Sequence, residues 1–191
     1  MRFEDGTVLR LYPQTVQDFS VYTGREFSTE EFETLKTAAG AMSAKMRAVR
    51  IVAASSVSKR DLEQRLVQKG EDPRQAKEAV SWMAELELVD DRKTAEQVVR
   101  RCIGKGYGLA RAKQALYEKR IPKEYWDEVL ADYPDQQDTI EDYLRSKLTA
   151  TSDSATVKKA VDALLRRGHS YGNIRRVLNT LSVDTDDFPE V

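Results

Sequence analysis

The chain has 191 residues, 40% of them hydrophobic, so it is long enough and apolar enough to bury a core, and disorder throughout is excluded. Thirty-one basic and 32 acidic side chains leave a net charge of −1, so the overall balance names no partner. One cysteine excludes an internal disulfide, a single histidine leaves a zinc site short of its usual ligands, and no signal peptide or membrane-length apolar run is present, which predicts a cytoplasmic protein.

Residues 1–45 are predicted to form a small N-terminal hairpin and helical cap. The Asp5-Gly6 pair lies between two short alternating runs within residues 2–11, which is the strongest local signal for a β-hairpin. Ser28 and Glu31 have the spacing of a capping box, so a helix should begin there. Apolar residues then continue at helical spacing through 29–54, as one long helix or as two.

A spaced set of residues recurs after this cap, at steps of 50 and 48 residues. Its three copies have the same internal offsets and consist of Leu66, Gly70, Ala76 and Val80; Leu116, Arg120, Trp126 and Leu130; and Leu164, Gly168, Ile174 and Leu178. Repetition with this period predicts a mainly α, elongated array of three-helix repeats. We place the three repeats at 46–90, 91–134 and 135–182, followed by an acidic tail at 183–191.

The residue that ends the second helix of each repeat is glycine in the first and third copies. Gly70 and Gly168 are expected to adopt the left-handed backbone that closes a helix. Arg120 holds this position in the second copy, where a side chain costs about 1 kcal/mol, so that helix either ends differently or tolerates strain. Pro122 is predicted to start the next helix. Cys102 lies in an apolar stripe and is predicted to be a small core residue.

Three motifs resemble the RecX family of RecA regulators. They are Ser58-Lys59-Arg60-Asp61-Leu62-Glu63-Gln64-Arg65-Leu66-Val67-Gln68-Lys69-Gly70, Leu88-Val89-Asp90-Asp91-Arg92-Lys93-Thr94-Ala95 and the segment from Lys105-Gly106-Tyr107-Gly108 to Lys119-Arg120-Ile121. The order and spacing of these motifs cover residues 48–130, and the third copy of the repeat extends the resemblance to residue 181. The chain departs from the family pattern at Ser55, Thr94, Ala115 and Arg120.

This resemblance implies a binding function. Members of the family are curved modules of three-helix repeats that lie in the groove of the RecA–single-stranded DNA filament and limit its growth, its ATP hydrolysis and strand exchange. The implied setting is DNA recombination, DNA repair and the SOS response in the cytoplasm. The implied partners are the RecA filament and single-stranded DNA, with weaker binding to double-stranded DNA, and the chain is expected to be a monomer. No catalytic residue, cofactor or metal is implied.

Basic residues are the candidates for contact with DNA phosphates or an acidic protein surface. Residues 45–130 carry 19 basic and 14 acidic groups (+5), and residues 145–176 carry 8 and 2 (+6). Such blocks are expected of a protein that faces a polyanion, although solvated helix faces give the same pattern. The candidates are Arg47, Arg50, Arg60, Arg65, Arg100, Arg101, Lys105, Arg111, Lys113, Arg166, Arg167, Arg175 and Arg176.

Two other functions stay open from the sequence. Residues 157–181 resemble a helix-turn-helix with Arg175 and Arg176 on the second helix, which would suit a DNA-reading protein. A helical-repeat scaffold that binds only proteins is the second alternative. An enzyme is not supported, because Asp91 of the Asp90-Asp91 pair lies where a helix cap is needed, and the glycines at 104–108 lack the Lys-Ser/Thr of a phosphate loop.

Overall fold

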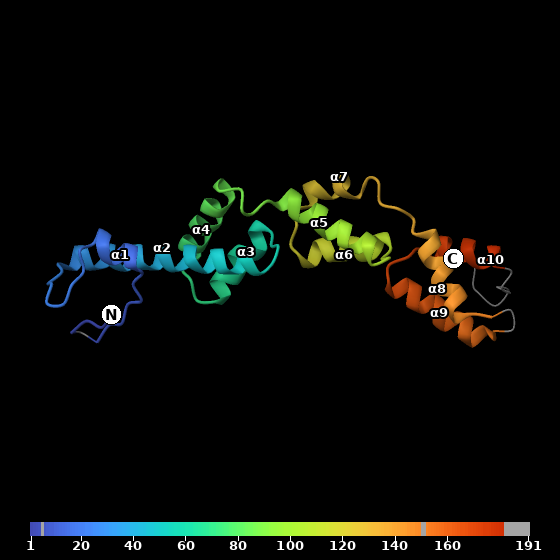
Figure 1. The fold of residues 1–191 in the computed structure, drawn as a ribbon, viewed down its shortest axis with the longest axis horizontal. Coiled ribbons are helices and arrows are strands. Elements are labelled where there is room, and N and C mark those ends of the chain that lie inside the picture. The colour runs from blue at the N-terminus through green and yellow to red at the C-terminus, as the bar shows by residue number, and fades with distance from the viewer. Residues whose placement is uncertain (5, 150–151, 182–191) are drawn as a thin grey trace. The chain divides into compact units, whose positions relative to one another are not determined.

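The computed structural model describes residues 1–4, 6–149 and 152–181, and the regular elements in these ranges are helices (Figure 1). The prediction of a mainly α fold is confirmed. The chain divides into two compact units, Met1–Asp91 and Arg92–Val191. Among the helices described, none has the length and apolar character needed to cross a membrane.

The helices follow one another with short connections. Those of the first unit are α1 (Pro13–Asp18), α2 (Thr29–Ala54), α3 (Lys59–Gln68) and α4 (Pro73–Glu85). The next is α5 (Asp91–Gly104), whose first residue is the last of the first unit. The rest of the second unit contains α6 (Leu109–Glu118), the 3₁₀ turn η1 (Lys123–Tyr125), α7 (Trp126–Leu130), α8 (Gln137–Lys147), α9 (Ser154–Arg166) and α10 (Tyr171–Thr180).

The longest helix of the first unit is α2. It begins with the predicted capping box, in which Ser28 Oγ accepts from the Glu31 amide at 3.2 Å and Glu31 Oε2 accepts from the Ser28 amide at 2.8 Å. The helix continues through Gly40, which settles the choice between one helix and two. A Cβ at Gly40 would lie 2.4 Å from Gln75 Oε1 of α4, and Gln75 donates to the Thr37 carbonyl at 3.1 Å. Glycine here lets α4 approach α2 closely.

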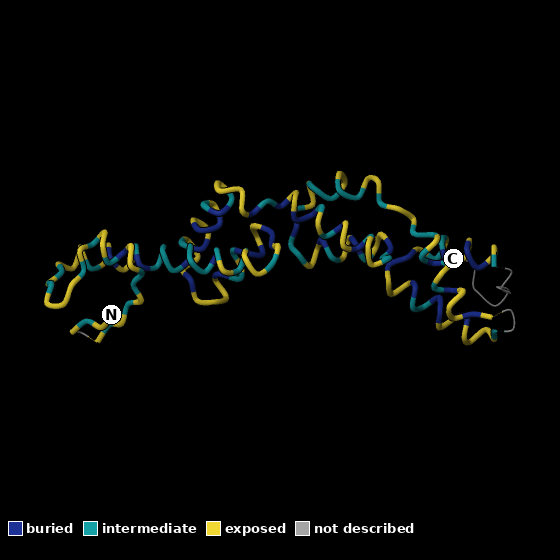
Figure 2. The backbone as a smooth tube through the Cα atoms, in the orientation of Figure 1, coloured by how far each residue is buried: buried dark blue, intermediate teal, exposed yellow. Residues whose placement is uncertain are grey.

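Buried apolar residues gather in three clusters, which Figure 2 shows as dark segments on the inner sides of the helices. The first lies among α2, α3 and α4 and includes Leu62, Leu66, Val80 and Met83. The second lies among α5, α6 and α7 and includes Val99, Leu116 and Ile121. The third lies among α8, α9 and α10 and includes Ile140, Leu144, Leu164 and Ile174. The assignment of one repeat to each cluster, with the boundaries given above, stays a prediction.

The predicted helix ends have the same geometry in all three copies. Gly70, Arg120 and Gly168 take left-handed backbone angles, with φ of 88°, 54° and 86°. The amide that follows each of them donates to the carbonyl of the buried leucine of its own copy, at 3.1, 3.1 and 3.2 Å. These bonds satisfy carbonyls that the helix end would otherwise leave unpaired. Arg120 therefore tolerates the strained conformation instead of ending its helix differently.

The third helix of the second repeat is shorter than the sequence predicted. Pro122 precedes η1, and only α7 continues in α-helical form. Trp126 begins α7, and its indole nitrogen donates to the Ile121 carbonyl at 3.1 Å. Pro134 lies four residues beyond α7 and disfavours helix at the residue before it, which limits how far the helix can extend.

The prediction of an N-terminal β-hairpin is not confirmed. In the described residues of this segment, Arg2 and Val8 form one isolated antiparallel bridge, and no strand is present. The runs on either side of the turn are too short to build a ladder, and the Phe3 ring packs edge-on against Phe32 of α2 with 4.9 Å between centroids. Backbone hydrogen bonds between Met1 and Leu9 and from the Phe3 amide to the Thr7 carbonyl, together with the packing of Phe3 on α2, hold this segment in place. The predicted acidic tail at 183–191 lies outside the described residues.

Candidate nucleic-acid interface

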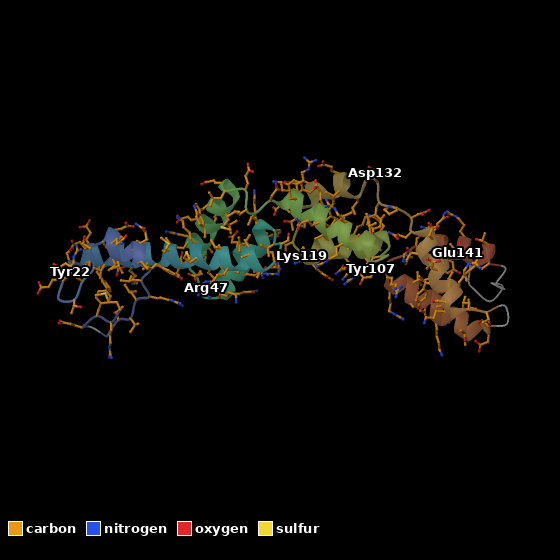
Figure 3. The ribbon with its side chains drawn as sticks, viewed as in Figure 1. Tyr22, Arg47, Tyr107, Lys119, Asp132 and Glu141 are labelled. Carbon is orange, nitrogen blue, oxygen red and sulfur yellow. The ribbon has the colours of Figure 1, made fainter. Side chains whose placement is uncertain are left out.

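Two of the predicted basic residues in the first unit are engaged by buried carboxylates. Arg47 Nε lies 2.5 Å from Glu71 Oε1, and Glu71, only 8% exposed, also accepts from Ser43 Oγ at 3.0 Å. Arg65 Nη2 lies 2.9 Å from the buried Asp61. Breaking such pairs leaves a buried charge without compensation, so these arginines stabilise the fold. Arg47 is labelled on α2 in Figure 3.

The remaining basic candidates divide into two groups. One group is exposed and shares no described cleft, and it consists of Arg50, Arg60, Arg100, Arg101, Arg175 and Arg176. Arg176 also lies 3.9 Å from Asp135, and Lys113 lines a separate hollow that contains the same Asp135. The structure brings Lys105, Arg111, Arg166 and Arg167 together, on the walls of one open cleft of ≈ 510 Å³ in the second unit. We call this the basic cleft.

Two tyrosines line the basic cleft together with these four residues. Tyr107 follows α5 and is labelled in Figure 3, and Tyr143 belongs to α8. The Arg167 guanidinium lies 4.7 Å from the centre of the Tyr143 ring, and Lys105 Nζ lies 5.9 Å from the centre of the Tyr107 ring. Both separations are within the range of cation–π attraction. The cleft therefore presents aromatic rings and cations side by side.

A backbone crossing at two glycines holds the walls of the basic cleft together. The Gly108 amide donates to the Arg167 carbonyl at 2.9 Å, and the Ala110 amide donates to the Gly168 carbonyl at 3.2 Å. A Cβ at Gly108 would lie 2.1 Å from the Gly168 carbonyl oxygen, a distance that real contacts do not allow. The start of α6 and the end of α9 can therefore meet only because both positions are glycine.

Buried polar contacts around this crossing fix the segment before α6. His169, 4% exposed, has Nε2 3.1 Å from the Gly106 carbonyl, so Nε2 carries the proton and donates. The Tyr133 hydroxyl donates to the Tyr107 carbonyl at 2.6 Å, and burial raises the pKa of Tyr133 to about 12. Both contacts are with the backbone of residues 106 and 107. They hold Tyr107 in position without using its ring.

The cations that line the basic cleft suit it to bind an anion. Burial raises the pKa of the Cys102 thiol above 9.0, which keeps it protonated and unreactive, and Cys102 is buried in the core as predicted. Asp91, which the sequence placed at a helix cap, accepts from the Lys59 amide at the start of α3 at 2.8 Å. Within the ranges that the structure describes, no group of three or more His, Cys, Asp or Glu could hold a metal ion.

Comparison with known families decides which proteins this chain resembles. The model of the RecX second three-helix domain matches residues 90–130, which contain α5, α6 and α7 and therefore one wall of the basic cleft. Over this segment the chain is similar to the RecX family. The sequence-based resemblance to that family is thus confirmed.

Relatives extend the RecX similarity beyond this segment. Regulatory protein RecX of Vibrio parahaemolyticus serotype O3:K6 is 28% identical over 152 residues, which cover 75% of this chain and 95% of that protein. Regulatory protein RecX of Stenotrophomonas maltophilia strain R551-3 is 29% identical over 144 residues, covering 74% and 86%. A crystal structure of regulatory protein RecX has the same fold, with a TM-score of 0.68, 16% identity, and coverage of 88% of this chain and 86% of that one.

The two tyrosines and the glycine crossing were not predicted as site residues. Tyr143 lies against the third apolar cluster, as a helix-packing residue would. Tyr107 stands between two glycines and two residues after Lys105, a pattern that could have marked an exposed aromatic beside a cation. Nothing in the sequence pairs Gly108 with Gly168, because the two positions are 60 residues apart.

The only histidine of the chain should make stability depend on pH. Burial lowers the pKa of His169 below 6.5, the nearby Arg167 charge lowers it further, and the hydrogen bond to Gly106 opposes both. In the described structure Nδ1 has no hydrogen-bond partner. Below pH 6.5 the unfolded chain therefore binds a proton that the folded chain does not, and the free energy of unfolding should fall as pH decreases from 6.5 towards the folded pKa.

Two measurements check this expectation. Urea unfolding between about pH 7.5 and 5.5, a range in which carboxylates stay ionised, should show the decrease in the natural chain and lose it in His169→Gln. Proton NMR of the single imidazole should give a pKa below that of the urea-unfolded chain. A folded-state pKa equal to or above the unfolded value would contradict the prediction.

Proposed function

We propose that this protein is a regulator, and most simply an inhibitor, of the RecA recombinase. It would bind in the groove of the RecA–single-stranded DNA filament as a monomer and limit filament growth, ATP hydrolysis and strand exchange. The observation that carries the proposal is the similarity to regulatory protein RecX along 75% of the chain, covering 95% of the Vibrio protein. We propose no catalytic activity and no cofactor.

The charge distribution supports a polyanionic partner. Four cations line the basic cleft, and further arginines are exposed on α5 and α10. Cations near DNA phosphates displace bound counterions, which favours association at low salt. The helix-turn-helix alternative loses support, because the turn between α9 and α10 has the same hydrogen bonds as the turns at Gly70 and Arg120. A feature common to three copies is better explained as packing than as a dedicated reading head.

The rate of ATP hydrolysis by RecA on single-stranded DNA tests the proposal. The protein is titrated into the reaction at fixed physiological salt, and the rate should fall when there is much less than one molecule for each RecA subunit. An Arg100→Ala/Arg101→Ala variant, which removes two exposed charges of α5, should need a higher concentration for the same suppression if α5 faces the filament. An unchanged rate at saturating concentrations of the natural chain would contradict the proposed function and favour a protein-binding scaffold.

A further inference from the structure

We propose that the basic cleft binds one short stretch of single-stranded nucleic acid, with a backbone phosphate on its cations and an unpaired base stacked on Tyr107. This inference adds a nucleic-acid binding site to the proposed function, and it rests on that function for the identity of the polyanion. Its geometry rests on the structure of the second unit alone. The cleft volume of ≈ 510 Å³ lies within the range of sites that hold small organic groups.

The first step of the argument is the net charge of the cleft. Lys105, Arg111, Arg166 and Arg167 contribute four positive charges. Glu118 lies 3.2 Å from Arg111 and removes one of them. The C-terminal ends of α5 and α9 add about half a negative charge each, which leaves a net charge of about +2 in the cleft.

The need to neutralise the two helix ends does not explain why four cations line one cleft. Lys105 directly follows α5, and Arg166 and Arg167 end α9, so one cation at each helix end would satisfy the helix dipole. The crossing of Gly108 and Gly168 brings the two ends together, and Arg111 of α6 is added from the same crossing. Like charges that line one cleft repel one another, and an anion between them lowers that repulsion. A bound phosphate would remove this repulsion.

The aromatic rings favour a single strand over a duplex or an acidic protein. Every base has a flat face that can stack on an aromatic side chain, but in a duplex that face is covered by neighbouring bases. Guanidinium groups bind phosphate oxygens through paired hydrogen bonds. Each ring has a cation over it, but Lys105 Nζ lies 5.9 Å from the centre of the Tyr107 ring, whereas the Arg167 guanidinium lies 4.7 Å from the centre of the Tyr143 ring. The Tyr143 ring also packs on the apolar cluster, so Tyr107 is better suited to stacking.

Binding of a labelled oligothymidylate to the full chain, followed by fluorescence anisotropy at several salt concentrations, tests the proposal. Lys105→Gln/Arg166→Gln should weaken binding by at least about tenfold at low salt, since each loses a charge-assisted contact. It should also reduce the log–log salt slope by about 0.7, which corresponds to the one phosphate held by the cleft. The matched control is Lys158→Gln/Lys159→Gln, which removes two exposed charges from α9 away from the cleft.

Stacking is tested separately from charge. Tyr107→Leu should weaken oligothymidylate binding by about fivefold or more and leave binding of an abasic strand of equal length unchanged. Tyr107→Phe should bind both as the natural chain does. Because the fixed contacts of Tyr107 are with its backbone carbonyl, these substitutions should leave the thermal melting temperature nearly unchanged.

Several results would overturn the proposal. The first is equal weakening of oligothymidylate binding by Lys105→Gln/Arg166→Gln and by the control Lys158→Gln/Lys159→Gln. The second is an equal effect of Tyr107→Leu on binding of normal and abasic strands. The third is displacement of the bound strand by polyglutamate at matched charge. No binding of the oligonucleotide at low salt would also overturn it, and suppression of RecA ATP hydrolysis in the same preparation would then leave the proposed function standing. Selective binding of the oligonucleotide in the cleft, without any effect on RecA ATP hydrolysis, would support binding in the cleft and contradict the proposed function.

Discussion

Replacing Gly108 with alanine is expected to lower the free energy of unfolding by about 3 kcal/mol, the upper end of the usual cost of overpacking. The new Cβ would lie 2.1 Å from the Gly168 carbonyl oxygen and 2.4 Å from the His169 amide nitrogen. These are backbone atoms of a segment that is itself held by hydrogen bonds, so no flexible side chain can move aside. The α6 and α9 ends would have to separate, and the bonds that join them would be lost.

The companion change Gly168→Ala should be at least as damaging. Its Cβ would lie 2.3 Å from the Arg111 amide nitrogen, and its φ of +86° is also unfavourable for a residue with a side chain. Gly172→Ala is the matched control, because that glycine lies in α10 with no atom within 4 Å of the new Cβ. It should raise stability by about 0.5 kcal/mol.

Urea unfolding gives the free energies, and amide hydrogen exchange locates the damage. In Gly108→Ala the amides of residues 108 and 110 should lose protection first, since they donate across the crossing. If the free energy of unfolding of Gly108→Ala is within about 0.5 kcal/mol of that of the natural chain, the close approach of the two backbones at Gly108 is contradicted.

Truncating the buried leucine of each repeat copy is the second change with a large expected effect. Leu66, Leu116 and Leu164 are each 0% exposed and lie in three different apolar clusters. Replacement of each by alanine should cost about 3 kcal/mol, because the lost apolar contacts leave a cavity that the surrounding helices fill only in part. The three variants should therefore be similarly unstable.

Hydrogen exchange should show a different location of damage in each variant. Leu66→Ala should expose amides in α2, α3 and α4, whereas Leu164→Ala should expose those in α8, α9 and α10. Leu165→Ala provides the control, since Leu165 is the next residue of α9 and is 41% exposed; its change should stay below about 1 kcal/mol. Equal loss of stability in the Leu164 and Leu165 variants would contradict the assigned core.

Local features of this chain could be predicted from sequence because they depend on neighbouring residues. The capping box at Ser28 and the left-handed Gly70 and Gly168 satisfy backbone groups within a few residues of themselves. The strained Arg120 was identified by its place in the repeat. The N-terminal hairpin is not confirmed, because the two short runs pair through one isolated bridge between Arg2 and Val8 and form no described strand.

The candidate site could be predicted only in part. Sequence alone identified the basic residue types and the RecX resemblance, and the spacing of apolar and helix-ending residues determined the mainly α fold class. Tertiary structure decided which cations act together: Arg47 is held by Glu71, while Lys105, Arg111, Arg166 and Arg167 share one cleft. That cleft depends on two backbones that approach closely at Gly108 and Gly168, and contacts between residues 60 positions apart are set by packing of whole helices, which no local pattern encodes.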